Sequence, residues 1–299
     1  MHVTLAADAE FAMPLAVTLA SLSHSQSEEI EVTVFHDDLA PATIARIEAG
    51  LGGRLAVRWH RVDPAQVAGA HYSTFLTRAS LFRLLLPRLL PDLDRVLYLD
   101  CDIVVTASLR PLWETDLDGA LLGAVRDAGS PFPAGPLGTD WRGLGLDPAT
   151  PYFNTGMLLI PLEEWRRQEV SERALSLLRR RQPRWGDQDG LNAVVDGRWV
   201  ELPRRWNLQS PDALGTGLAW ALWREDVELA LRDPAVVHYT DRDKPWMAGC
   251  EHPLAQHWYR ALEGSDWSGW RPRHPRRRRL ARIAAGARAL PLRYSRTAP

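Results

Sequence analysis

The chain has 299 residues, 45% of them hydrophobic, and a formal net charge of −1, which indicates a globular protein with one large domain or two small ones. Two cysteines, Cys101 and Cys250, exclude a disulfide framework and a cysteine zinc site and favour a reducing cytoplasm. No run approaches the ~18 apolar residues of a membrane span, and the first residues lack the basic region and cleavage site of a signal peptide.

Predicted strands and helices alternate through the first hundred residues. Strands are expected at 2–7, 30–35 and 55–60, and helices at 14–22 and 41–51. This alternation predicts an α/β fold with a mostly parallel central sheet and helices on both faces. Ligands bind beyond the carboxyl ends of such strands, so Asp8, which follows the first strand, is a candidate site residue. The sequence has neither a G-x-G-x-x-G fingerprint after this strand nor a P-loop.

The stretch RVLYLDCDIVV, residues 95–105, holds two acids between the apolar runs 96–99 and 103–105. Alternate residues at a strand end point the same way, so the carboxylates of Asp100 and Asp102 can face one spot. Two hard oxygen ligands there suit Mg²⁺ or Mn²⁺ bound together with a diphosphate. Read in isolation, the tripeptide is also explained by a strand followed by an acidic turn.

A helix interrupted at Pro87 is expected at 80–90, with Arg83 in its most apolar part. Such an arginine pairs with an acid or extends to solvent, and the functional interpretation is that it reaches the acidic site. A strand expected at 121–126 ends at Asp127.

The next segment, 128–150, is rich in Gly and Pro and long for a loop. It is interpreted either as a lid over a substrate site or as a plain insertion. Asn154 and Gly156 then precede an apolar strand within 152–160, and a long amphipathic helix is expected at 161–181.

Asp187, Gln188 and Asp189 crowd the start of a probable helix at 186–195. Acids are favoured there because they can cap exposed amides and interact with the helix dipole. Capping explains Asp187, but it does not explain three polar groups before an apolar run.

His238 lies at the end of a short strand expected at 235–239, where it is either a metal ligand or a structural histidine. Lys244 follows and is the only lysine in the chain. A lysine is a compact charge and an arginine a planar fork, so its survival in an arginine-rich chain indicates either a specific role or chance.

Together these segments resemble the retaining glycosyltransferases of family 8, including bacterial lipopolysaccharide galactosyl- and glucosyltransferases. The resemblance covers roughly residues 3–260 and rests on the order and spacing of its motifs. The motifs are Ala7-Asp8, SLFRLLLP with Arg83, RVLYLDCDIVV, VRD with Asp127, FNTGMLLI, GDQDGLN and HYTDRDKPW.

This resemblance implies the GT-A fold, a UDP-sugar donor and a divalent cation, Mn²⁺ with Mg²⁺ as the alternative. The implied metal ligands are Asp100, Asp102 and His238. The implied nucleotide-binding residues are Ala7 and Asp8, with Lys244 at the diphosphate. The residues expected around the donor sugar are Arg83, Asp100, Asn154, Asp187 and Gln188.

The family further implies transfer of a hexose, glucose or galactose, with retained configuration to a saccharide or glycolipid acceptor. Two routes are open. In the favoured one, the acceptor hydroxyl attacks from the face that the diphosphate leaves. In the other, Asp189 or Asp127 forms a covalent glycosyl-enzyme; Gln188 stands where a nucleophile is expected, but an amide is a poor one.

Two positions depart from the family pattern. Glu10 stands where many relatives have Asn or Asp, and Asp241 where they usually have Gly. These changes leave open a catalytically inactive nucleotide-sugar-binding or scaffold protein of the same fold. A metal-dependent nucleotidyltransferase is a third reading, but the glycine-rich N-terminal loop that it normally needs is absent.

The predicted domains are a catalytic domain at 1–265 and an Arg-rich tail at 266–299. Residues 271–299 contain ten arginines and no acid, and 280–290 has apolar residues at helical spacing. A basic amphipathic segment is typical of binding to an anionic membrane surface, which predicts a cytoplasmic protein peripheral to the inner face. A disordered tail is the alternative. Nucleic-acid binding is not expected, because the body is acidic and nucleic-acid motifs are absent.

Overall fold

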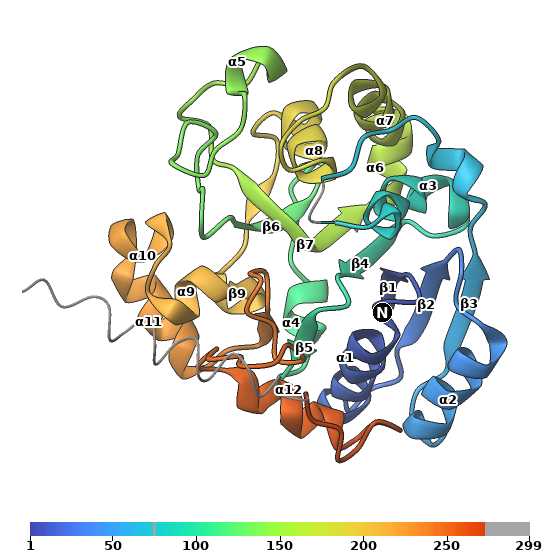
Figure 1. Ribbon diagram of the computed structural model, residues 1–299. Helices are drawn as coiled ribbons and strands as arrows, with labels where there is room; N and C mark the ends of the chain where they lie inside the picture. Colours follow the sequence, from blue (N-terminus) through green and yellow to red (C-terminus); the bar gives the residue numbers. More distant parts are fainter. Residues whose placement is uncertain (74–75, 273–299) are drawn as a thin grey trace, which may run out of the picture.

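The fold is given by a computed structural model and is described for residues 1–73 and 76–272. A seven-stranded sheet forms its centre (Figure 1). The strand order is β3 (Val57–Arg61), β2 (Glu31–His36), β1 (His2–Ala7), β4 (Arg95–Leu99), β7 (Phe153–Pro161), β6 (Gly123–Arg126) and β8 (Val200–Glu201). β1 pairs in parallel with β2 and β4, β2 with β3, and β6 with β8. The prediction of a mostly parallel α/β sheet is therefore confirmed.

Strand β7 runs antiparallel to both of its neighbours, β4 and β6. Its first residues therefore lie beside the last residues of β4, and Leu99 pairs with Met157. The amide of Asp100 also donates to the Gly156 carbonyl at 2.8 Å. The direction of β7 thus brings Asn154 to the sheet edge at which the acidic pair lies.

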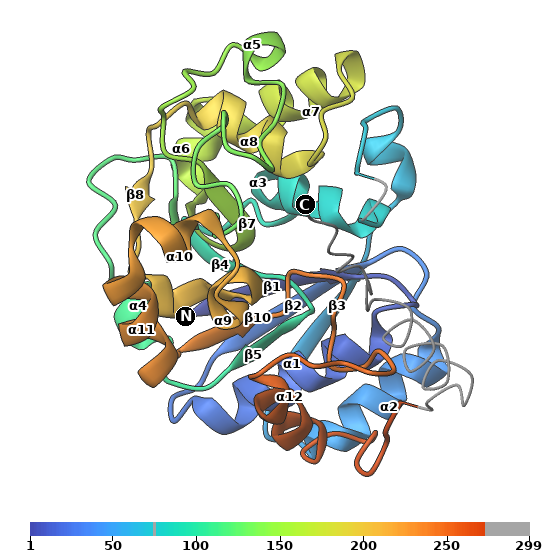
Figure 2. The same cartoon turned by 60° about the vertical axis from the view of Figure 1, so that its left-hand side comes forward.

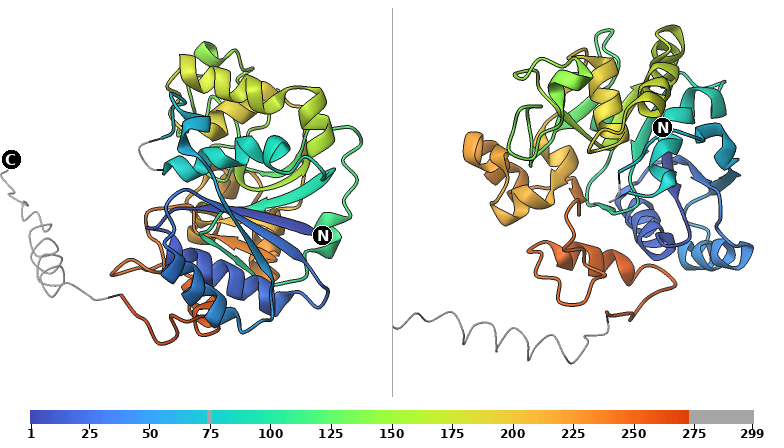
Figure 3. Two further views of the ribbon diagram at one scale, coloured as in Figure 1. Left: turned by 90° about the vertical axis from the view of Figure 1, so that its right-hand side faces the viewer. Right: turned by 45° about the horizontal axis from the view of Figure 1, so that its top comes forward.

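Helices cover both faces of this sheet, as Figure 3 (left) shows. Helices α1 (Ala12–Ser25) and α2 (Pro41–Leu51) pack on one face. The other face is covered by η2 (Arg78–Leu85), α3 (Leu86–Leu89), α6 (Leu162–Arg167), α7 (Val170–Arg180) and α8 (Asp187–Val195). Strand β4 contributes alternate residues to the two cores, Leu97 and Leu99 to the first and Val96 and Tyr98 to the second, as the two-residue period of a strand requires.

A second, three-stranded sheet lies between the large sheet and the C-terminal helices (Figure 2). Its strands are β5 (Ile103–Val105), β10 (Val236–His238) and β9 (Leu208–Gln209), with β10 in the middle. The surrounding helices are α9 (Ser210–Leu214), α10 (Leu218–Leu222), α11 (Arg224–Arg232) and α12 (Ala255–Leu262). The remaining short helices are η1 (Pro64–Val67), α4 (Arg110–Trp113), α5 (Trp141–Leu144) and η3 (Arg204–Asn207).

Two predicted helices differ from the observed ones. The expected helix at 80–90 is the 3₁₀-helix η2 followed by the single turn α3, in which Pro87 occupies the first turn. The expected long helix at 161–181 is divided into α6 and α7, because Glu169 adopts a left-handed conformation with φ 52°. A non-glycine residue with positive φ cannot continue a right-handed helix.

The C-terminal end of the described chain packs against the body. The Arg46 guanidinium lies 3.9 Å from the ring centre of Trp267, and Trp270 meets Trp258 edge-on. The domain boundary placed at residue 265 stays a prediction, and the proposed amphipathic segment lies outside the described residues. Within 1–73 and 76–272, no helix has the length and apolar content needed to cross a membrane.

Candidate active site

Asp100, Asp102 and His238 converge where β4 ends and β5 begins. One ligand atom from each lies within 4.8 Å of the others. The pairing of His238 with Ile103 across β10 and β5 brings the imidazole to this place, and its Nε2 is 3.1 Å from Asp102 Oδ1 and 3.9 Å from Asp100 Oδ2. Two carboxylates and one imidazole are a donor set that suits a divalent cation such as Mn²⁺ or Mg²⁺.

The only lysine of the chain contacts one of these carboxylates, Asp102. Lys244 Nζ lies 2.5 Å from Asp102 Oδ2 and also donates to the Tyr239 carbonyl. Burial alone would raise the pKa of Asp102, but Lys244 and His238 hold that pKa well below its usual range. Asp102 therefore stays ionised, as a metal ligand must, and Lys244 adds a positive charge beside the proposed cation site.

Arg83 reaches the acidic pair from within the apolar core, as its functional interpretation required. It is 2% exposed, and its guanidinium contacts Asp100 Oδ1 at 2.8 Å and Asp187 Oδ2 at 3.1 Å. Burial alone would lower the pKa of Arg83, but these carboxylates raise it above its usual value. Burial raises the pKa of Asp187 to about 6, against the opposing effect of Arg83. Arg83 thus fixes two acids at the floor of the site.

A network of amides and one carboxylate borders this group. Asn154 Nδ2 donates to Gln188 Oε1 at 3.2 Å and to Asp127 Oδ2 at 3.3 Å, and Gln188 Nε2 also donates to Asp127 Oδ2 at 3.2 Å. The other Asp127 oxygen accepts from the amides of Gly129 and Ser130. The side chains of Gln188 and Asp127 are partly exposed, so they can meet a bound ligand.

Asp189, by contrast, is completely buried. Its Oδ1 accepts from the Tyr152 hydroxyl at 2.6 Å, and its Oδ2 from the Trp185 amide at 2.8 Å. Burial raises the pKa of Asp189. These surroundings are those of a structural carboxylate that joins α8 to the preceding turn and to β7, and they favour Gln188 and Asp127 as the groups that face a substrate.

The predicted nucleotide-binding residues lie at the end of β1. Ala7 is buried, and Asp8 accepts the Phe11 amide at 3.1 Å. The ring of Phe11 meets Trp246 edge-on at 6.2 Å, so the loop after Asp8 adjoins the loop that carries Lys244. Glu10 and Asp241, the two departures from the family pattern, are both exposed.

The sequence analysis missed three groups that contact this site. Tyr98 donates its hydroxyl to Asp100 Oδ1 at 2.9 Å, Asn207 contacts His238 and Asn154, and Gln209 contacts the backbone on both sides of Asp127. Tyr98 could have been found from its two-residue spacing to Asp100 on the predicted strand. Asn207 and Gln209 lie in a segment without periodicity, and the sequence carries no signal for them.

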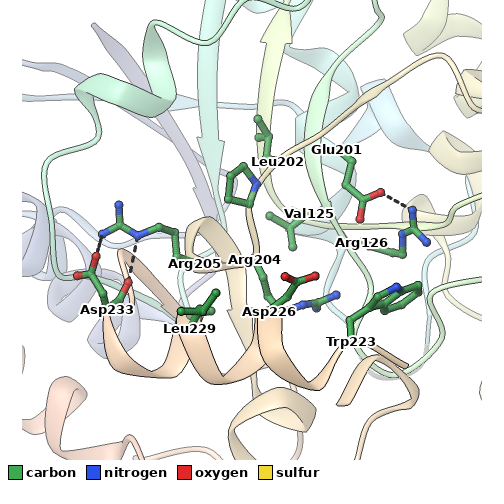
Figure 4. Close-up of a pocket in the computed structure, with 12 residues that line it drawn as sticks. Val125, Arg126, Glu201, Leu202, Arg204, Arg205, Trp223, Asp226, Leu229 and Asp233 are labelled. Atoms are coloured by element: carbon green, nitrogen blue, oxygen red, sulfur yellow. Dashed lines mark hydrogen bonds and ion pairs between the residues drawn. The ribbon is translucent and has the colours of Figure 1, made fainter. Parts of the chain in front are cut away.

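A cavity of about 710 Å³ lies between β6, η3 and α11 and includes none of the predicted site residues (Figure 4). Its charged groups are largely paired, Arg126 with Glu201 and Arg205 with Asp233. Arg204 of this cavity also pairs with Asp212, a carboxylate whose pKa burial raises to about 6. The larger convergence of polar groups is at the acidic pair, which we therefore regard as the functional site.

The sequence matches the model of a protein family described as glycosyl transferase family 8 over residues 2–250. The chain belongs to glycosyltransferase family 8. The fold is accordingly of the GT-A type, and the Asp100–Asp102 pair with His238 corresponds to a D-x-D-like motif at a candidate metal site.

The chain is also similar to individual proteins and solved structures. The chain is 27% identical to general stress protein A of Bacillus subtilis, over 90% of this chain and 95% of that protein. It is 28% identical to the lipopolysaccharide 1,2-glucosyltransferase of Escherichia coli, over 74% of this chain and 64% of that protein. Among solved structures, it is similar to the galactosyltransferase LgtC in complex with donor and acceptor sugar analogues, with a TM-score of 0.77 and 29% identity over 89% of this chain and 96% of LgtC. The chain is thus a family 8 glycosyltransferase similar to lipopolysaccharide glycosyltransferases.

Proposed function

We propose that this protein is a metal-dependent retaining glycosyltransferase that transfers glucose or galactose from a UDP-sugar to a hydroxyl of a saccharide or glycolipid. The observation that carries the proposal is the convergence of Asp100, Asp102 and His238 within 4.8 Å. This group lies beside Lys244 and beside the polar network built on Arg83. A cation site next to hydrogen-bonding groups for a sugar is what a nucleotide-sugar transferase needs.

Charge on the departing diphosphate is the main demand of the reaction. A bound Mn²⁺ or Mg²⁺ would supply positive charge where that negative charge develops. Lys244 is proposed to leave Asp102 and pair with the diphosphate, so that the lysine stabilises the same charge. Ala7 and Asp8 are proposed to contact the nucleoside, since they end the strand next to β4 at the same sheet edge.

The donor sugar is proposed to be surrounded by Arg83, Asp100, Asn154, Asp187 and Gln188, with Arg83 and the fully buried Asp187 behind Asp100. The two carboxylates considered as nucleophiles are both engaged by hydrogen bonds, Asp127 with four donors and Asp189 with two. A carboxylate held by several donors is a weaker nucleophile because those bonds stabilise its charge. This supports the same-face route, in which the leaving diphosphate accepts the acceptor proton, over a covalent glycosyl-enzyme.

The likeness to lipopolysaccharide glycosyltransferases supports a glycan or glycolipid acceptor. Association of the Arg-rich tail with an anionic membrane surface at the inner face remains part of the proposal, and it depends on residues outside the described range.

The direct test is proton NMR of the purified protein with UDP-glucose or UDP-galactose, Mn²⁺ and a panel of saccharide acceptors. We expect one donor to be consumed and the new glycosidic bond to have the α configuration of the donor. A β-linked product would contradict the retaining mechanism. Metal-dependent donor binding without turnover on any acceptor or on water would instead support the inactive binding protein. Glu10 and Asp241 would then be the first residues to replace with those of the family pattern.

A further inference from the structure

Two buried amide side chains, Asn207 and Gln209, contact the site from the small sheet. They are 0% and 1% exposed and lie at the end of η3 and in β9. Buried polar groups require hydrogen-bond partners, and both residues find some of these partners among the site residues or the backbone next to them. Neither residue belongs to the groups proposed to touch the metal or the donor.

The direction of the hydrogen bonds around Asn207 is set by a backbone amide. The Gly156 N–H can only donate, and it donates to Asn154 Oδ1 at 3.0 Å. That oxygen therefore accepts from Asn207 Nδ2 at 2.9 Å, which leaves Asn207 Oδ1 as the acceptor that faces His238 Nδ1 at 2.9 Å. His238 Nδ1 must then carry the proton.

This proton assignment matters for the second nitrogen of the ring. With a proton held on Nδ1, Nε2 is the ring nitrogen left to bind a cation, and it lies 3.1 Å from Asp102 Oδ1. The Asn207 contact thus presents the metal-binding nitrogen to the acidic pair. Outer partners of this kind orient a ligating histidine and typically change metal affinity by about 10- to 100-fold.

Asn207 also acts on the donor-sugar side. Its Nδ2 fixes the orientation of the Asn154 amide, so that Asn154 Nδ2 points at Gln188 Oε1 and Asp127 Oδ2. Without this donor, the Asn154 amide could rotate by 180° at the cost of the Gly156 contact. One side chain therefore connects the metal-binding histidine to the amides proposed to hold the sugar.

Gln209 provides a matched contrast. Its Oε1 accepts the Ala128 amide at 2.9 Å and its Nε2 donates to the Arg126 carbonyl at 3.1 Å, so it holds the backbone on both sides of Asp127. Gln209 is paired in register with His238 across β9 and β10, but among the described residues its side chain makes no hydrogen bond to the imidazole.

We propose that Asn207 is a positioning residue that fixes the Nδ1-protonated tautomer of His238 and, through Asn154, couples occupation of the metal site to recognition of the donor sugar. Gln209 instead holds the backbone on both sides of Asp127 and caps α9. The metal and sugar parts of this inference rest on the proposed function, whereas the tautomer part is a property of the free protein.

Two substitutions separate the two contacts of Asn207. Asn207→Asp keeps an oxygen that accepts from His238 Nδ1 but loses the donor to Asn154, and Asn207→Leu loses both contacts at similar volume. Gln209→Leu is the control for a buried amide in the same segment. Thermal melts and circular dichroism of the full-length proteins show whether each variant is folded.

The first readout is the affinity of the nucleotide-free proteins for Mn²⁺. The free Mn²⁺ is measured by its electron paramagnetic resonance signal. We expect affinity to fall by at least about tenfold in Asn207→Leu and to stay within about threefold of wild type in Asn207→Asp and Gln209→Leu. The second readout is the ratio of the UDP to the UDP-sugar dissociation constant with Mn²⁺, which should drop towards 1 in Asn207→Asp. Wild-type Mn²⁺ affinity in Asn207→Leu, or equal losses in both Asn207 variants, would overturn the proposal.

Imidazole ¹⁵N NMR of the metal-free protein tests the tautomer independently of the proposed function, with His238 assigned from a His238→Gln spectrum. We expect a protonated Nδ1 in wild type and Asn207→Asp, and a mixture of tautomers in Asn207→Leu. A wild-type ring with no proton on Nδ1 would refute the inference even if the protein binds Mn²⁺. The expected tautomer in a protein that binds no Mn²⁺ would instead leave the positioning role intact and count against the proposed function.

Discussion

The large and the small sheet place their site residues by different means. The large sheet supplies Asp100 and Asn154 from the ends of largely buried strands, and main-chain bonds between β4 and β7 set their backbone positions. The small sheet supplies His238 from the three-residue strand β10, which is itself paired with β5. The comparison teaches that main-chain pairing places the backbone in both halves of the site, whereas the side chains are oriented by different partners, Asp100 by Arg83 and Tyr98, and His238 by the buried amide of Asn207.

Removing a carboxylate between the two sheets should have the largest effect. Asp102 contacts both His238 and Lys244, so Asp102→Asn should reduce transfer at least about 100-fold by removing charge that the cation and the lysine need. Initial rates of UDP release measure this loss, and Asp92→Asn at an exposed position is the control. Normal turnover of Asp102→Asn would contradict a metal role for this residue.

A substitution at Gly156 in the large sheet can displace the His238 ring of the small sheet, because the two residues are in close contact. A Cβ at Gly156 would lie 2.0 Å from His238 Cε1, so Gly156→Ala must displace the imidazole. We expect Mn²⁺ affinity to fall by at least about tenfold, measured by Mn²⁺ titration. Gly190→Ala, whose Cβ would meet the Leu178 side chain at no less than 3.2 Å, should bind Mn²⁺ normally. Equal affinities of the two variants would show that the His238 ring position is unimportant.

Lys244→Ala tests the contribution of the loop that follows the small sheet. Loss of its charge should weaken UDP binding about tenfold in the presence of Mn²⁺, since the diphosphate loses a close cation. Lys244→Arg should retain part of the affinity, because it keeps the charge but not the compact shape. Isothermal titration calorimetry measures both, and unchanged UDP affinity in Lys244→Ala would mean that the single lysine has no role at the diphosphate.

The last prediction concerns how the stability of the fold around the loop that carries Lys244 depends on pH. Burial lowers the pKa of His252 to about 4, and His252 is held between the Ser210 hydroxyl and the Leu254 amide. In the unfolded chain this histidine takes up a proton near its usual pKa of 6.5. Above pH 6.5, His252 is neutral in both states and does not affect the free energy of unfolding. As the pH falls from 6.5 towards 4, the unfolded chain binds a proton at His252 that the folded protein does not, so the free energy of unfolding decreases.

Between pH 7 and pH 4.5, wild type should lose about 2 kcal/mol more unfolding free energy than His252→Gln. Urea unfolding at both pH values measures the difference. Equal losses in the two proteins would show that His252 is not held neutral in the fold.

The same contrast explains what could be predicted from the sequence. The strands around β4 are apolar runs bounded by polar residues, so the acidic pair, Asn154 and the parallel arrangement could be inferred from local pattern. β9 has two residues and no pattern, and Asn207 meets its partners only through contacts 31 and 53 residues apart in sequence. The role of Asn207 depends on a tertiary arrangement that cannot be predicted from the sequence of such short strands.

The division of helix 161–181 has a related cause. The apolar spacing continues through Glu169, but that residue takes a left-handed conformation that no local signal in the sequence indicates. Likewise, the acid cluster at the start of α8 could be recognised, but only the structure separates Asp189, buried against Tyr152, from the partly exposed Gln188.

The group formed by Asp100, Asp102 and His238 is proposed to be a cation-dependent site for a sugar nucleotide. The most direct measurement is calorimetric titration of the full-length protein with UDP, UDP-glucose and UDP-galactose, each with and without Mn²⁺. We expect the protein to bind these ligands only in the presence of Mn²⁺, and to bind one of the two sugar nucleotides more tightly than UDP. A folded protein that binds none of the three, with or without the cation, would contradict this proposal.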